Sequence, residues 1–244
     1  GEELERAELV ATAGDRLAAV GREDSHHLEL AENGESVEGD GGADPGDDGV
    51  DVTDDAAGLY AAAMAAYDLA LQKQPQEKNF QVNRTYCRNQ WGLAQFQVKL
   101  ASRGTAHPFQ LTGLNGSAVE LAKHKGKVVV LEFVAGWCPS CRESMPKLVE
   151  LRRRFQGKPV QVLVLALDRV EGWKKSGSEE KSQALSRETG LTFAWADEAT
   201  YYQYGSFNSI PTLILIDKSG RIAAQAAAEE REPDKLAKLI TQLL

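Results

Sequence analysis

Residues 127–134 form an almost wholly apolar stretch that leads directly to two cysteines separated by two residues. The stretch predicts a buried strand, and the residues after it predict a helix from Cys138 to Phe155. A strand that passes directly into a helix indicates an α/β arrangement, because the helix packs against the sheet that contains the strand. Cys138 is therefore expected at the N-terminus of that helix.

This position matters for the reactivity of the Cys138 sulfur. The unpaired N–H groups and the dipole of a helix N-terminus stabilise a thiolate, which is the attacking species in disulfide exchange. Cys141 lies one helical turn later, close enough to form a disulfide with Cys138, and is expected to be less exposed. We predict that both are catalytic: Cys138 attacks a disulfide, and Cys141 resolves the mixed disulfide that results.

From residue 104 onward, strand and helix patterns alternate, which predicts an α/β domain. The last two strands flank a turn, so an antiparallel hairpin is expected to make the sheet mixed. Strands are expected at 119–121, 127–134, 160–167, 191–195, 212–217 and 221–227, and helices at 138–155, 178–189, 197–204 and from 233 onward.

Pro211 stands just before the apolar strand at 212–217. On its own, a proline at a strand start is an edge or turn residue. Together with the upstream sequence WCPSC, the pattern resembles the thioredoxin-like fold, in which this proline is cis and packs against the cysteine pair. The resemblance implies that the backbone of Ile210 can pair with an extended substrate segment beside Cys138.

Residues from about 107 to 244 resemble the TlpA/ResA branch of thioredoxin-like thiol–disulfide oxidoreductases. The resemblance is carried by three segments: GKVVVLEFVAGWCPSCRESMPKL, VQVLVLALD and NSIPTLILIDKSGRI. It implies an extracytoplasmic protein, often tethered to a membrane, that reduces disulfides in partners such as apocytochromes c. The partners expected are disulfide-containing proteins and a membrane-bound or soluble dithiol donor upstream. The sequence alone does not decide between reduction and oxidation.

The same resemblance gives roles to four residues around the cysteines. Trp137 is expected to shield the nucleophile, and Pro139 to lie beside it in the substrate-binding surface. Ile210 and Pro211 are expected to shape the substrate groove.

Glu132 occupies a strand position where thioredoxin has a buried aspartate and many TlpA/ResA members have asparagine. Burial would raise the pKa of its carboxyl toward neutrality, as a base requires. We therefore predict that Glu132 accepts the proton of Cys141. The alternative is a partly solvated acid that pairs with a lysine or arginine.

Two other chemistries fit the cysteine spacing less well. A structural zinc site needs four ligands. None of the candidates besides Cys138 and Cys141 is paired at ligand spacing near a second cysteine; these candidates are Cys87, His26, His27, His107 and His124. A peroxiredoxin needs Thr or Ser three residues before the attacking cysteine, where this chain has Ala135. We expect neither a metal nor an organic cofactor, and Cys87 is expected to be a buried thiol.

Charge is distributed unevenly along the chain. Residues 1–55 carry 18 acidic and 3 basic side chains, a net charge of −15, whereas residues 56–244 carry 18 acidic and 25 basic ones, a net charge of +7. An acidic arm would repel the phosphates of a nucleic acid and would compete with them for the basic part of the chain. This charge distribution argues against nucleic acid as a partner. We interpret 1–31 as an acidic arm with weak helical periodicity and 32–55 as a disordered acidic linker.

Residues 56–103 predict a helical hairpin, with helices from 56 to Pro75 and from 79 to 102, ahead of a thioredoxin-like domain at 104–244. A second hypothesis makes the protein a binding module, in which the hairpin recruits a partner. Neither a transmembrane helix nor a secretory signal is expected in the sequence. The expected location is the periplasm or cell envelope if a targeting segment or membrane anchor was removed before residue 1, and the cytoplasm otherwise.

Overall fold

The computed structural model describes residues 52–226 and 230–244. The chain divides into two compact units, residues 1–94 and 95–244, and each is described by itself. The predicted acidic arm at 1–31, and the linker at 32–55 up to residue 51, lie outside the described residues.

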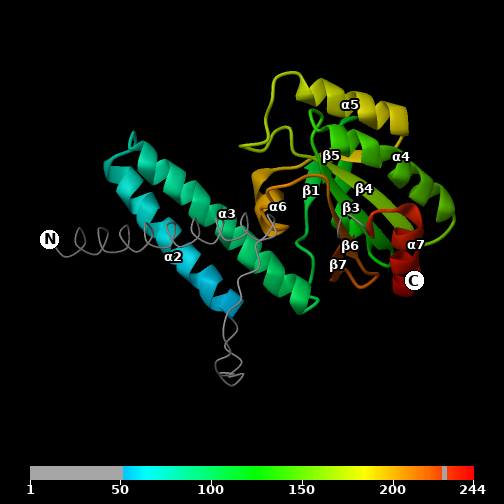
Figure 1. The fold of residues 1–244 in the computed structure, drawn as a ribbon, viewed down its shortest axis with the longest axis horizontal. Helices are drawn as coiled ribbons and strands as arrows, with labels where there is room; N and C mark the ends of the chain where they lie inside the picture. Colours follow the sequence, from blue (N-terminus) through cyan, green and yellow to red (C-terminus); the bar gives the residue numbers. More distant parts are fainter. Residues whose placement is uncertain (1–51, 227–229) are drawn as a thin grey trace, which may run out of the picture. The chain divides into compact units, whose positions relative to one another are not determined.

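The first unit contains α2 (Val52–Lys73) and most of α3 (Lys78–Ala101) (Figure 1). The two helices lie within a few residues of the predicted ones, although α2 begins four residues earlier than expected. Tyr67 and Cys87 are fully buried in a small apolar cluster between the helices, so Cys87 is buried as predicted. The hairpin as a partner-binding module stays a prediction.

The second unit is built on a mixed sheet of five strands in the order β5-β4-β3-β6-β7. Strand β3 pairs in parallel with β4 and antiparallel with β6, and β7 completes an antiparallel hairpin with β6. The mixed sheet and its final hairpin confirm the prediction. The strands are β3 (Val128–Val134), β4 (Val160–Ala166), β5 (Thr192–Trp195), β6 (Thr212–Ile216) and β7 (Ile222–Ala226).

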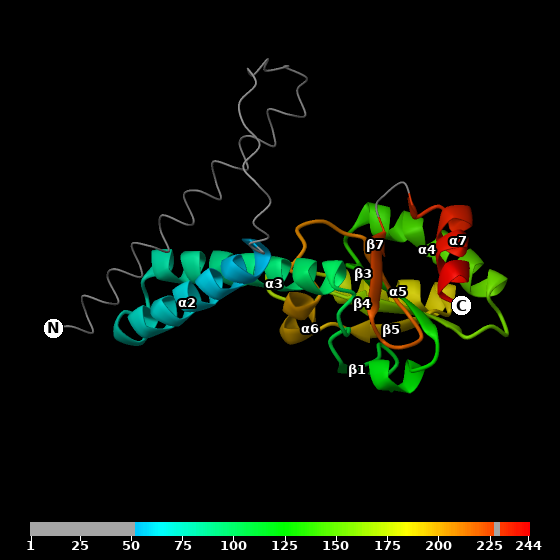
Figure 2. The same cartoon turned by 90° about the horizontal axis from the view of Figure 1, so that it is seen from below.

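Helices cover both faces of this sheet, which explains why every residue of β3 is buried. On one face, Val130 belongs to an apolar core with residues of α4 (Pro139–Arg154), α5 (Ser178–Thr189) and α7 (Pro233–Leu243). On the other face, Phe133 packs against Tyr204, which follows α6 (Glu198–Gln203), and against Phe207. Figures 1 and 2 show α4 and α7 on one side of the sheet and α6 on the other.

The structure adds one strand that the sequence analysis did not predict. Strand β1 (Gln110–Thr112) pairs antiparallel with β2 (Ala118–Glu120), and a short 3-10 helix, η1 (Leu121–His124), follows. With three residues and one buried side chain, β1 offers too short a pattern to be recognised without its partner.

Candidate active site

Cys138 is the N-cap residue of α4, as the sequence predicted. Its sulfur accepts a hydrogen bond from the backbone N–H of Cys141 at 3.1 Å, and the hydroxyl of Ser140 lies 3.3 Å from it. The first turn of α4 therefore directs an N–H group and the positive end of its dipole toward this sulfur. Both favour negative charge there, so the position suits a thiolate.

A disulfide joins Cys138 to Cys141, and their Cα atoms are 5.3 Å apart, within the usual range for such a bond. The two residues differ in depth: Cys138 is 5% exposed and Cys141 is fully buried. Solvent therefore reaches Cys138 but not Cys141, which is the difference in exposure expected from the sequence.

The loop before β6 brings the predicted proline to the cysteines. The Ile210–Pro211 peptide is cis, as the resemblance implied. The carbonyl oxygen of Ile210 lies 3.8 Å from the Cys138 sulfur and 3.4 Å from the Ser140 hydroxyl. Arg231 donates a hydrogen bond of 2.6 Å to the carbonyl oxygen of Pro211 and thereby anchors the loop from behind.

Trp137 is half-buried and held by the loop between β4 and α5. Its indole N–H donates to the carbonyl oxygen of Trp173 at 2.7 Å, and the two rings stack with centroids 6.1 Å apart. The ammonium of Lys175 lies 3.4 Å from the centroid of the Trp137 ring, a cation–π contact. Three contacts thus fix the residue that precedes Cys138, whereas Pro139 is exposed beside it.

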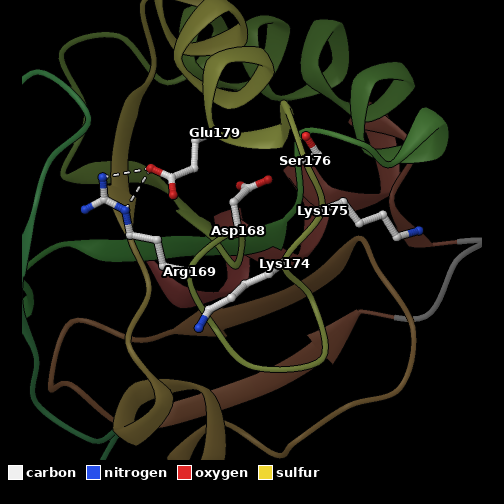
Figure 3. A pocket seen from close by; sticks show the side chains of 6 residues that line it. All are labelled: Asp168, Arg169, Lys174, Lys175, Ser176 and Glu179. Atoms are coloured by element: carbon white, nitrogen blue, oxygen red, sulfur yellow. Dashed lines mark hydrogen bonds and ion pairs between the residues drawn. The ribbon is translucent and has the colours of Figure 1, made fainter.

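A pocket of about 400 Å³ lies on this same loop; Figure 3 shows its lining side chains, Asp168, Arg169, Lys174, Lys175, Ser176 and Glu179. Two of its three cations are paired with acids. Arg169 pairs with Glu179 at 2.9 Å, and Lys174 pairs with Glu171 at 3.3 Å. The first pair joins the loop to α5, and the second lies within the loop.

Asp168 connects the loop to the active-site turn. It is 3% exposed, and its carboxylate accepts hydrogen bonds from the backbone N–H of Gly136 at 2.9 Å and from the hydroxyl of Ser182 at 2.7 Å. The turn before the cysteines is therefore tied to α5. No sequence spacing relates Asp168 to Gly136, so this contact escaped the sequence analysis.

Replacing Gly136 with alanine is expected to lower the free energy of unfolding by about 2–3 kcal/mol, because overpacking a fixed backbone contact forces the chain to shift. An added Cβ would meet the carbonyl oxygen of Ser178, and the backbone nitrogen of Ser182 at 2.8 Å. Urea unfolding at constant pH measures the change.

Gly58→Ala is the matched control, since a Cβ at Gly58 in α2 has no neighbour within 4 Å. Alanine is favoured over glycine inside a helix, so this variant should be neutral or slightly stabilised. Equal losses in the two variants would contradict the tight contact at Gly136.

Glu132 lies in the centre of the sheet, on the face covered by α4, and is 1% exposed. Burial raises the pKa of its carboxyl to about 7, although a hydrogen bond from Ser144 and the charges of Arg231 and Lys147 oppose this rise. The Ser144 hydroxyl lies 3.0 Å from Oε2 of Glu132. The predicted burial is confirmed, and the alternative of a partly solvated acid is wrong. The role of Glu132 as proton acceptor stays a prediction.

Four residues around the site were not singled out from the sequence: Ser144, Arg231, Trp173 and Lys175. Ser144 carried a usable signal, because it lies three residues after Cys141 and so on the same face of α4. The other three reach the site from segments distant in the chain.

No group of three or more His, Cys, Asp or Glu side chains in the described part of the chain is placed to hold a metal ion. Within residues 52–226 and 230–244, no helix is both long and apolar enough to span a membrane.

Comparison with known proteins gives one family and several similar proteins. The Redoxin family model matches residues 101–243. The thiol-disulfide oxidoreductase ResA of Bacillus thuringiensis (strain Al Hakam) is 31% identical over 124 residues, which are 50% of this chain and 67% of the relative. The thioredoxin-like protein YneN of Bacillus subtilis (strain 168) is 29% identical over 140 residues, or 57% of this chain and 75% of YneN.

Among solved structures, a thiol:disulfide interchange protein of the thioredoxin family from Chlorobium tepidum TLS superposes with a TM-score of 0.50 at 19% identity. The match covers 57% of this chain and 94% of that protein, and it confirms the thioredoxin-like fold. Because the Redoxin family model spans more than half of the chain and the relative ResA is a thiol-disulfide oxidoreductase, the chain belongs to the redoxin family and is a thiol–disulfide oxidoreductase similar to ResA.

Proposed function

We propose that this protein reduces disulfide bonds in partner proteins outside the cytoplasm, with Cys138 as the attacking residue. The observation that carries the proposal is the placement of the Cys138 sulfur: at the start of α4, hydrogen-bonded to the N–H of Cys141, and nearer to solvent than Cys141. A sulfur in this position attacks disulfides as an anion.

In the first step, the Cys138 thiolate attacks one sulfur of a substrate disulfide. The substrate S–S bond breaks, a bond forms between Cys138 and the attacked sulfur, and the other substrate sulfur leaves as a thiolate. The carbonyl of Ile210 beside Cys138 supports a role for this backbone in aligning an extended substrate segment, with Pro211, Pro139 and Trp137 around it. These four residues are proposed to bind substrate.

In the second step, Cys141 gives its proton to Glu132 and attacks the Cys138 sulfur. The bond between Cys138 and the substrate breaks, and the second substrate sulfur leaves as a thiolate. The substrate has then gained two electrons, and the enzyme holds the Cys138–Cys141 disulfide. A pKa near 7 supports Glu132 as the acceptor, because such a carboxyl exchanges protons readily at neutral pH.

The sequence resemblance to the TlpA/ResA branch supports the finer assignments. Apocytochromes c are the proposed class of substrate, and a dithiol donor upstream would return the enzyme to its reduced form. The proposed location is the periplasm or cell envelope, reached through a targeting segment or anchor ahead of residue 1.

A trapping experiment tests the order of the two cysteines. Cys141→Ser is expected to accumulate mixed disulfides with partner proteins through Cys138, since the resolving sulfur is absent. Non-reducing electrophoresis and mass spectrometry of the captured proteins give the measurement. Heme-binding CxxCH segments among the captured partners would support apocytochromes c as substrates.

The control carries Cys138→Ser together with Cys141→Ser and should capture nothing. Cys87 is buried in the first unit and is kept in both proteins, so any adduct that persists in the control is assigned to Cys87. Adducts of equal abundance in a single Cys138→Ser variant would show that the order of attack is wrong.

A further inference from the structure

The hydroxyl of Ser144 lies between Glu132 and the backbone of Cys141. Its oxygen is 3.0 Å from Oε2 of Glu132 and 2.8 Å from the carbonyl oxygen of Cys141. A serine hydroxyl has one hydrogen to donate, although its oxygen can also accept hydrogen bonds. It can therefore donate to only one of these two oxygens at a time.

The protonation state of Glu132 decides which oxygen receives the hydrogen. When Glu132 is ionised, Ser144 donates to the carboxylate. When Glu132 is neutral, the carboxyl O–H donates to the Ser144 oxygen, and Ser144 donates to the carbonyl oxygen of Cys141. Both states of the buried carboxyl thus keep a hydrogen-bond partner, which removes the penalty of an unpaired buried group.

We propose that Ser144 is a positioning residue for the resolving step, which keeps the Glu132 carboxyl hydrogen-bonded both before and after it takes the proton of Cys141. The inference rests on the proposed role of Glu132 as proton acceptor. During the step, the thiol proton of Cys141 moves to Glu132, the Ser144 hydrogen turns to the Cys141 carbonyl, and the Cys141 thiolate displaces the substrate sulfur from Cys138.

Other charges also face Glu132. Arg231, from the segment before α7, and Lys147 on α4 both lower the pKa of Glu132, but the hydrogen bond from Ser144 lowers it more than either cation does. Lys147 already pairs with Glu232 at 2.6 Å, and the Arg231 guanidinium donates to the carbonyl oxygens of Ala226 and Pro211. Ser144 is therefore the group whose removal should change the proton affinity of Glu132 most.

The test compares Ser144→Ala with Ser144→Thr in the full chain. Loss of a hydrogen bond to a charged group should raise the pKa of Glu132 by about one unit in Ser144→Ala, whereas Ser144→Thr keeps a hydroxyl and should stay near the unmodified value. Carbon NMR of labelled glutamate carboxyls measures this pKa directly. Ser102→Ala is the matched control, because the Ser102 hydroxyl also donates to a helix carbonyl, that of Val98, and not to Glu132.

The resolving rate gives the second readout. The reduced protein is mixed with an aromatic disulfide reagent. Attack by Cys138 releases one coloured thiolate and resolution by Cys141 releases a second, so the rate of the second release measures the resolving step. A pKa one unit higher leaves about a fifth as much Glu132 ionised at pH 7, so Ser144→Ala should resolve about fivefold more slowly there. The difference should vanish well above pH 8, and Ser144→Thr should restore the rate.

Unchanged Glu132 titration and an unchanged pH profile in Ser144→Ala would overturn the inference. So would an equal loss of rate in Ser144→Ala at every pH, which a purely structural role predicts. Failure of the proposed function looks different. If Glu132 is not the acceptor, Glu132→Gln keeps the pH profile of resolution, and Ser144→Ala moves the Glu132 pKa without moving the rate.

Discussion

Replacing Cys138 with serine is expected to abolish disulfide exchange, with a fall in rate of at least about a thousandfold. A serine hydroxyl does not ionise near neutral pH, so the N-terminus of α4 has no anion to stabilise at this position. Cys141 does not compensate, because it is fully buried and a substrate disulfide does not reach its sulfur. Reduction of insulin by the variant with dithiothreitol as electron donor measures the loss.

Cys87→Ala is the matched control for this loss. Cys87 is also buried, but it lies in α3 within the unit of residues 1–94, whereas Cys138 and Cys141 lie in the unit of residues 95–244. Its removal should leave the rate of insulin reduction unchanged. A Cys138→Ser variant that retains a tenth or more of the original rate would show that another residue attacks the substrate.

The cysteine pair could be predicted because its geometry is local. A strand followed at once by a helix places Cys138 at the helix start, and spacing alone sets Cys141 one turn further on. The burial of Glu132 could be predicted for the same reason, since it lies within an apolar run that forms the fully buried β3.

Residues that act across the fold could not be predicted in this way. Arg231 reaches Pro211 only because β7 returns beside β6, and Lys175 reaches Trp137 only because the loop after β4 folds back over the start of α4. Such contacts depend on the path of the chain in three dimensions. Periodicity and spacing describe single elements and leave these contacts undetermined.

The free energy of unfolding is expected to fall by about 3 kcal/mol between pH 4.5 and pH 7 because of Glu132 alone. The pKa of Glu132 is about 7 in the folded protein, whereas the ordinary value for a glutamate is 4.5. Between these values the folded state binds more protons than the unfolded state, so stability decreases as pH rises. The destabilisation by Glu132 is absent below the ordinary pKa of 4.5, where the carboxyl is neutral in both states. It reaches its full size above the folded-state pKa of about 7.

Glu132→Gln should remove this dependence, since glutamine has a similar size and no charge to bury. The variant should match the unmodified protein near pH 4 and exceed its stability by about 3 kcal/mol at pH 8. Urea unfolding of the oxidised proteins across this range measures the difference. His107 and His124, whose pKa values are lowered by burial, titrate equally in both proteins and cancel.

Glu150→Gln is the matched control on the surface. Hydrogen bonds from Arg153 and Arg154 lower the pKa of Glu150 to about 2. Above about pH 6 this acid is ionised in both the folded and the unfolded state, so its removal should not change the slope of stability against pH between pH 6 and pH 8. A constant difference between Glu132→Gln and the unmodified protein would mean that the pKa of Glu132 is the same in the folded and unfolded states, and so that burial does not raise it. If the pH dependence of stability does disappear in Glu132→Gln, this variant should also resolve mixed disulfides slowly. The Glu132 carboxylate that destabilises the fold above pH 7 is also the proposed acceptor of the Cys141 proton.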